Sequence, residues 1–172
     1  MQEYLDYICK YCQAEGLTIA VAESVTAGYL QVHFSRASGA TGFFQGGITA
    51  YNVGQKVKHL GVEPIHAQAV NAVSPEVAAE MALGVCTLFN CNAGIAVTGY
   101  AAPVPELNIT DLFAYYAIAC KGRIIASGKI IPSAGHPEEV MQEYAREIIY
   151  TCYGRFKEYR FSTLNGGATK NG

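Results

Sequence analysis

Short apolar segments alternate with segments of helical periodicity along most of this chain, and that alternation constrains the fold more than any other feature. Continuous apolar segments of roughly four to eight residues are typical of buried strands, and helices between them are typical of a parallel sheet. We predict strands at 18–23, 47–51, 93–98, 112–120 and 123–131, and helices at 2–15, 27–36, 53–60, 75–89 and 137–156. The expected fold is α/β, a three-layer α/β/α sandwich with a mixed, mostly parallel sheet of about five strands.

Two local patterns mark element boundaries. Ser74 is a favourable N-cap, Pro75 suits the first position of a helix, and Glu76 lies near the positive end of the helix dipole. Lys121 and Gly122 separate two apolar segments, which predicts a tight hairpin. This hairpin would supply the antiparallel member of the sheet.

The composition is that of one globular domain. The chain has 172 residues, of which 51% are hydrophobic and 15% charged, enough for a single core. We expect one domain over residues 1–160 and a disordered tail over 161–172, where Gly, Asn, Ser and Thr prevail. The formal net charge of −2 gives no field that would attract nucleic acid, so no nucleic-acid partner is expected.

The sequence carries no signal for membrane insertion or export. No apolar run reaches the roughly 18–20 residues that span a bilayer. Glu3 and Asp6 lie where a signal peptide would need positive charge and an apolar stretch. We therefore expect a cytoplasmic protein without a membrane partner.

The six cysteines do not form a recognisable metal motif. Cys9 and Cys12 have the CxxC spacing, but no second such pair and no nearby pair of histidines accompanies them. A chain with this much apolar content does not need disulfides to be stable. Free, largely buried thiols are favoured over a metal or redox site.

Small or reactive residues follow three of the expected strands, at the sheet edge where α/β proteins bind ligands. Ser24 would lie at a strand-to-helix turn, either as a simple N-cap or beside an anion or oxyanion. Lys56 is either a base whose pKa is lowered by burial, or, with Lys58, part of a solvated helix face. Tyr51 is either a packed aromatic or a hydroxyl of the site. The residues alone leave these alternatives open.

Four segments, in this order, resemble motifs of the CinA C-terminal domain family. They are AESVTAG at 22–28, AYNVGQKVKHLGV at 50–62, NAVSPEVAAEMALG at 71–84 and GIAVTGYAAP at 94–103. The resemblance covers about residues 15–135 and implies the same three-layer fold, which is similar to that of anticodon-binding domains. The best-known activity of the family is hydrolysis of the carboxamide of nicotinamide mononucleotide to nicotinate mononucleotide and ammonia.

The resemblance also implies roles for individual residues. Ser24 would be the nucleophile, Lys56 its proton acceptor, and Tyr51 a supporting hydroxyl. No metal or organic cofactor is implied, and the partner is a small-molecule substrate. The substrate-binding residues would be Glu23, Thr26, Thr98, Gly99 and Tyr100.

The chain departs from the family pattern where a phosphate would be held. The glycine-rich stretch is replaced by residues 100–111, a change expected to narrow or fill the pocket, and Pro137 and Met141 stand where the family commonly has arginines. A second hypothesis is therefore a non-catalytic binding or assembly module whose pocket is filled by side chains such as Tyr100. A DNA-related role, suggested by the family name, gains no support from the net charge. The many tyrosines and apolar residues also predict a homo-oligomer.

Overall fold

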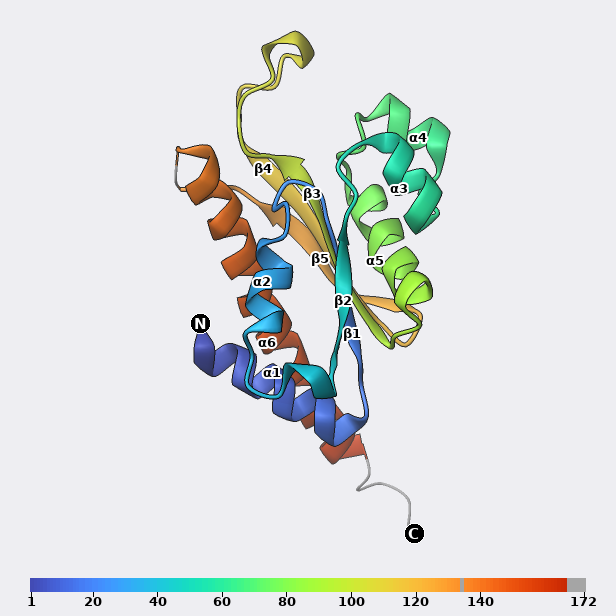
Figure 1. Cartoon of the computed structure of the whole chain (residues 1–172), viewed down its shortest axis with the longest axis vertical. Helices are drawn as coiled ribbons and strands as arrows, with labels where there is room; N and C mark the ends of the chain where they lie inside the picture. The colour runs from blue at the N-terminus through green and yellow to red at the C-terminus, as the bar shows by residue number, and fades with distance from the viewer. Residues whose placement is uncertain (134, 167–172) are drawn as a thin grey trace.

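The computed structural model describes residues 1–133 and 135–166, with side chains as far as Glu158. A five-stranded sheet lies between two layers of helices (Figure 1). Helices α1, α2 and α6 cover one face, and α3, α4 and α5 cover the other. The strands are β1 Ile19–Glu23, β2 Phe44–Thr49, β3 Ala93–Tyr100, β4 Phe113–Cys120 and β5 Arg123–Ile130. The α-helices are α1 Gln2–Glu15, α2 Tyr29–Ser35, α3 Val53–Leu60, α4 Pro64–Ala69, α5 Pro75–Phe89 and α6 Pro137–Gly166, and short 3₁₀ helices span Ala40–Gly42 and Pro105–Leu107.

The sheet is mixed, in the order β2-β1-β3-β4-β5. Strand β1 pairs in parallel with both β2 and β3, whereas β3–β4 and β4–β5 are antiparallel. Because β5 reverses the direction of β4, four of the five strands run the same way. The predicted three-layer α/β fold with a mostly parallel sheet is confirmed.

Alternating side chains of β1 serve two separate cores. Ile19 and Val21 pack with residues of α1, α2 and α6. Ala20 and Ala22 face the other side and pack with residues of α5. The period of two along a strand explains this division, and the small alanines let α5 lie close to the sheet.

Several predicted boundaries are confirmed, whereas the start of β2 and the end of the last helix are wrong and one helix was missed. The Ser74 hydroxyl accepts a hydrogen bond from the Val77 amide over 3.1 Å, as an N-cap should. Strand β2 begins at Phe44 rather than at 47, because its first residues pair with β1. Helix α4 was not predicted; its N-cap is Glu63, whose carboxylate accepts from two amides of the first turn.

The C-terminal helix is longer than predicted. Helix α6 continues to Gly166, past the expected start of the tail at 161. The remainder of the expected tail, 167–172, lies outside the described residues. None of the helices in the described part of the chain combines the length and the apolar character that crossing a bilayer requires.

Candidate functional site

The fold creates a crevice at the C-terminal end of β1. From this strand the chain proceeds first to β2 on one side and later to β3 on the other, with the two connections on opposite faces of the sheet. Such a reversal of strand order leaves an opening beyond the carboxyl ends of the strands, where open α/β sheets bind ligands. A cavity of about 620 Å³ lies here, and it is lined by residues that follow β1, β2 and β3 and by the start of α6.

Ser24 is held at the end of β1 by the backbone ladder. Its amide donates to the Val97 carbonyl over 3.0 Å, and the preceding carbonyl, of Glu23, accepts from the Ala50 amide over 2.8 Å. The chain then turns through Ala27 and Gly28, both with positive φ, before α2 begins. Ser24 is therefore fixed in place at the cavity wall, with its side chain 6% exposed.

Lys56 reaches Ser24 from the first turns of α3. Asn52 caps this helix, its side-chain oxygen accepting from the Gln55 amide over 3.0 Å. One turn later the Lys56 Nζ lies 3.0 Å from the Ser24 Oγ and 3.1 Å from the Tyr51 carbonyl oxygen. The structure thus brings the predicted nucleophile and proton acceptor into hydrogen-bond contact.

The environment of Lys56 disfavours its charged form. The side chain is 2% exposed, whereas Lys58 on the same helix is exposed. Among the described residues, no acidic side chain forms an ion pair with Lys56. Burial without a countercharge lowers the pKa of Lys56 from 10.5 to about 8. A sizeable neutral fraction is therefore present near neutral pH, as a base requires.

Tyr51 takes part through its backbone rather than through its hydroxyl. Its carbonyl oxygen accepts from Lys56 and lies 3.5 Å from the Ser24 Oγ. The side chain lines the cavity but is 74% exposed. In the described part of the chain the Tyr51 hydroxyl makes no hydrogen bond to Ser24 or Lys56, so the expected supporting hydroxyl has no counterpart in this geometry.

Glu23 and Thr26 lie next to Ser24 in sequence but do not line the cavity. The buried Glu23 carboxylate accepts from the Thr26 hydroxyl over 2.6 Å and from the amides of Gly28, Leu30 and Gln31 over 2.9–3.0 Å. These contacts satisfy the free amides at the start of α2. The geometry gives the two residues a positioning role behind Ser24, not contact with a ligand.

Thr98, Gly99 and Tyr100 line the cavity from the end of β3. The Thr98 hydroxyl donates to the Ala72 carbonyl over 2.7 Å, which ties the strand to the turn before α5. A Cβ on Gly99 would lie 2.4 Å from the Phe113 carbonyl oxygen, so no side chain fits at this position. The three predicted residues therefore shape the cavity wall.

The turn before α5 adds lining residues that the sequence did not reveal. Asn71 and Ala72 both have positive φ, and the Asn71 side-chain amide donates to the Tyr100 hydroxyl over 3.2 Å. Asn is the residue that tolerates this backbone region best after Gly. Because α4 was not predicted, nothing in the sequence indicated that this turn faces the site.

Residues 100–111 were expected to narrow or fill the pocket, but residues 101–112, which we call the arm, do not fill it. The start of the arm, through Val104, lines the wall, and the rest projects beyond the body of the protein (Figure 1). A bridge between Val104 and Ile109 closes the arm on itself. The non-catalytic hypothesis predicted a pocket filled by side chains. Among the described residues, no side chain fills the cavity, which is open.

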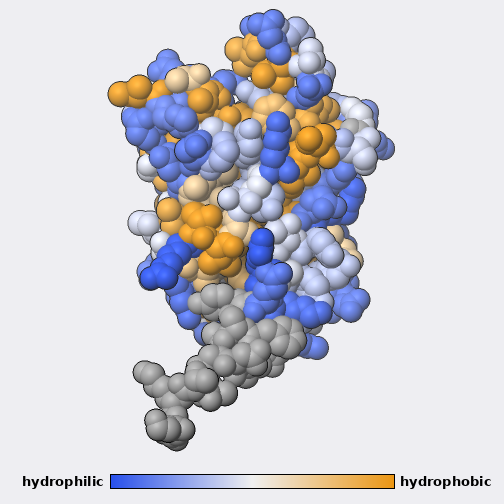
Figure 2. All heavy atoms as spheres, turned by 180° about the vertical axis from the view of Figure 1, so that it is seen from behind, coloured by the Kyte–Doolittle hydropathy of each residue, from blue (hydrophilic) through white to orange (hydrophobic). Residues whose placement is uncertain are grey.

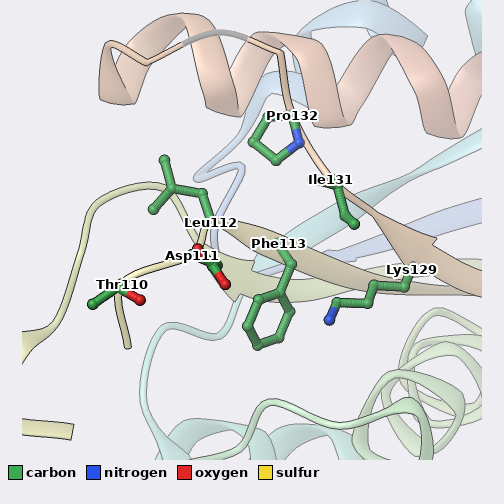
Figure 3. A pocket seen from close by; sticks show the side chains of 7 residues that line it. All are labelled: Thr110, Asp111, Leu112, Phe113, Lys129, Ile131 and Pro132. Carbon is green, nitrogen blue, oxygen red and sulfur yellow. The ribbon is translucent and has the colours of Figure 1, made fainter. Parts of the chain in front are cut away.

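A second hollow, of about 390 Å³, lies at the root of the arm and contains none of the predicted site residues. Figure 3 shows Lys129 beside the ring of Phe113, and its Nζ lies 4.1 Å from the ring centroid. This cation–π contact already occupies the lysine. The lining residues are Thr110, Asp111, Leu112, Phe113, Lys129, Ile131 and Pro132.

The described residues do not bring together three or more His, Cys, Asp or Glu side chains in a cluster that could hold a metal ion. Cys9 and Cys12 are both buried free thiols, and the Cys9 Sγ donates to the Ser38 carbonyl over 3.0 Å. The CxxC pair therefore contributes to the packing of α1.

Comparison with known proteins points to one family. The family model of the CinA C-terminal domain matches residues 2–148. A CinA-like protein of Chlorobium chlorochromatii is 35% identical over 144 residues, which are 82% of this chain and 34% of that protein. A putative competence-damage inducible protein of Halothermothrix orenii is 42% identical over 98 residues, 57% of this chain and 24% of that protein. The match thus spans about a quarter to a third of these relatives.

Solved structures share the fold over almost their whole length. A competence-damaged protein (CinA) superfamily protein of Klebsiella pneumoniae has a TM-score of 0.84 at 23% identity, and the match covers 91% of this chain and 98% of that one. The corresponding superfamily protein of Escherichia coli has a TM-score of 0.79 at 25% identity, covering 92% and 89%. These likenesses bear on the fold.

Proposed function

Because the chain belongs to the CinA C-terminal domain family, we propose that it hydrolyses a primary carboxamide with Ser24 as nucleophile and Lys56 as proton acceptor. One observation carries the proposal. The Lys56 Nζ lies 3.0 Å from the Ser24 Oγ, with both groups at the wall of an open cavity. A nucleophile and a base in hydrogen-bond contact are the minimum equipment for covalent catalysis of acyl transfer.

The first chemical step would begin with neutral Lys56. Its Nζ takes the Ser24 hydroxyl proton while the Oγ forms a bond to the amide carbon, giving a tetrahedral intermediate. The protonated Lys56 then gives its proton to the amide nitrogen, and ammonia leaves as the C–N bond breaks. Water then attacks the carbon of the resulting Ser24 ester while Lys56 takes a proton from the water. The C–Oγ bond breaks, Lys56 returns the proton to the Ser24 Oγ, and the carboxylic acid is released.

One backbone amide is available to stabilise the oxyanion. In the described part of the chain, the N–H group of Val25, which lines the cavity, donates to no acceptor. Val25 follows the nucleophile directly, in the turn before α2. One well-placed donor to the oxyanion contributes about 3 kcal/mol to transition-state stabilisation.

The resemblance makes nicotinamide mononucleotide the first amide to test, and a related small amide the alternative. The test incubates the protein at pH 8.5 with nicotinamide mononucleotide and, in parallel, with nicotinamide riboside, and measures ammonia. The controls are Ser24→Ala and Lys56→Met, which should abolish release, and Lys58→Met, which should retain it. No release above the Ser24→Ala background from either amide would contradict the proposal.

We also propose that the chain forms a homo-oligomer. Large apolar side chains are exposed at Ile65, Ile131 and Tyr150. Figure 2 shows apolar side chains in several separate groups on the face seen from behind. Light scattering coupled to size-exclusion chromatography tests this proposal, and a mass near the 18.4 kDa of one chain would contradict it.

A further inference from the structure

The residues around the cavity contain very little charge. Of the described residues that line it, only Lys56 is charged, and its Nζ is already in contact with Ser24 and Tyr51. No arginine and no second lysine of the described residues reaches the wall. A phosphate group is held in proteins chiefly by such cations, with arginine as the bidentate partner.

The start of α6 makes the mouth of the cavity still less suited to an anion. This helix contributes Pro137 and Met141 to the lining, and neither side chain can donate a hydrogen bond. Two carboxylates, Glu138 and Glu139, occupy the first turn of the same helix. Neither carboxylate lines the cavity, since Glu138 accepts from the Tyr29 hydroxyl over 3.0 Å and Glu139 lines a separate hollow. Their charges add only a longer-range repulsion toward a phosphate at this end of the helix.

The other polar side chains of the described wall are neutral. The Asn71 side-chain amide and the Tyr100 hydroxyl form a hydrogen-bonded pair that lines the cavity. Each keeps hydrogen-bonding capacity, since Asn71 has a free carbonyl oxygen and a second N–H, and the Tyr100 hydroxyl has its own proton to donate. Groups of this kind recognise hydroxyls and amides, and the remaining wall is largely apolar, with Val25, Val73 and Val104 among its members.

We propose that the site selects a carboxamide without a phosphate, whose apolar body packs against the valines and whose hydroxyls meet the Asn71–Tyr100 pair. The choice of a carboxamide rests on the proposed function. The exclusion of phosphate rests on the lining alone. Nicotinamide riboside and nicotinamide mononucleotide differ only by a phosphate, so they are the matched probes for this inference.

Binding is measured separately from turnover, by calorimetry on the Ser24→Ala protein in a buffer free of phosphate. We expect the riboside to bind at least about tenfold more tightly than the mononucleotide, because the phosphate would lose hydration at this wall without gaining a cationic partner. Equal or tighter binding of the mononucleotide, or no binding of either amide at millimolar concentration, would overturn the inference. Tight binding of the riboside without ammonia release by the wild-type chain would overturn the proposed hydrolysis and leave the inference standing.

A gain-of-function variant tests the same point from the other side. Met141→Arg, at a partly exposed helix position, supplies the missing cation and should narrow the preference for the riboside by about tenfold. Leu88→Arg adds the same charge at the C-terminal end of α5, away from the cavity, and should leave the ratio unchanged. If Met141→Arg does not fold, Val104→Arg at the arm side of the wall replaces it. If a folded Met141→Arg or Val104→Arg protein keeps the wild-type ratio of riboside to mononucleotide affinity, the inference is contradicted.

Discussion

The Lys56 Nζ and the Ser24 Oγ are 3.0 Å apart, and the Tyr51 carbonyl oxygen accepts from the same ammonium group over 3.1 Å. The lysine is buried and has no carboxylate partner among the described residues. A structural lysine would normally be exposed or paired, because an uncompensated buried charge is unfavourable. The arrangement is costly for stability and useful for proton transfer, which leads to two predictions about pH.

The rate of ammonia release should rise with pH and then level off. Only neutral Lys56 can accept the Ser24 proton, and burial lowers the pKa of Lys56 to about 8. Below that pH the neutral fraction, and with it kcat/KM, should fall about tenfold per pH unit. Initial rates between pH 6 and 10 test this expectation. A rate independent of pH across this range would exclude Lys56 as the proton acceptor.

Replacing Lys56 should stabilise the protein at neutral pH. The pKa is about 8 in the folded chain against 10.5 unfolded, so the unfolded state binds the proton more tightly. The shift lowers the free energy of unfolding by about 3 kcal/mol. This loss of stability is complete below pH 8 and disappears as the pH rises through 10.5. Two lost hydrogen bonds, at about 1 kcal/mol each, offset part of the gain. Lys56→Met should therefore be about 1 kcal/mol more stable at pH 7, and less so at pH 10.

Urea unfolding at the two pH values measures this difference. Lys58→Met removes an exposed lysine from the same helix and serves as the matched control, with a change of less than about 0.5 kcal/mol. If Lys56→Met lowers the free energy of unfolding equally at both pH values, burial of the charged Lys56 side chain does not destabilise the folded protein.

The spacing of apolar residues predicted the helix and sheet layers well because it reflects which side chains are buried. The apolar segment that became β1 and the Ser74 cap of α5 appear in the structure where they were expected. Strand β2 was harder, since Gly46 and Gly47 interrupt its apolar character. Pairing with β1 stabilises this strand from Phe44 onward, and a contact between distant segments leaves no local signal.

The site was only partly predictable for a similar reason. Ser24 and Lys56 are 32 positions apart, and it was the resemblance that favoured pairing them. Glu23 and Thr26 were expected to bind the substrate, but alternation along β1 turns the Glu23 side chain toward α2. Residues 100–111 were expected to narrow or fill the pocket, and a sequence does not indicate the direction in which a loop leaves a sheet.

Glu23 should matter for stability rather than for binding. Its carboxylate is buried and accepts hydrogen bonds from three amides at the start of α2. Glu23→Ala leaves these donors without a partner and should lower the free energy of unfolding by about 3–5 kcal/mol. Denaturant unfolding measures the loss, with the exposed Glu106→Ala as control. A stable Glu23→Ala protein with a raised KM would instead place Glu23 at the substrate.

Gly99 should not tolerate even a methyl group. A Cβ there would lie 2.4 Å from the Phe113 carbonyl oxygen and 2.5 Å from the Ala114 Cα, and backbone atoms cannot move aside cheaply. Gly99→Ala should cost about 1–3 kcal/mol and distort the end of β3 at the cavity. Gly54→Ala, in an exposed turn of α3 where the nearest atom is 3.4 Å away, should instead stabilise by about 0.5–1 kcal/mol. Thermal unfolding of the two variants should therefore shift in opposite directions.

The six free cysteines should differ widely in reactivity toward iodoacetamide. Cys91 is partly exposed, and the neighbouring Cys86 thiol lowers the pKa of Cys91, so a larger share of it is the reactive thiolate. Burial raises the pKa of Cys12 to about 12 and that of Cys152 well above its usual value. Peptide mass spectrometry of the native protein at pH 7.5 should find Cys91 labelled first, and Cys12 and Cys152 labelled only after unfolding. Native labelling of Cys152 as fast as Cys91 would mean that the packing between α1 and α6 opens readily in solution.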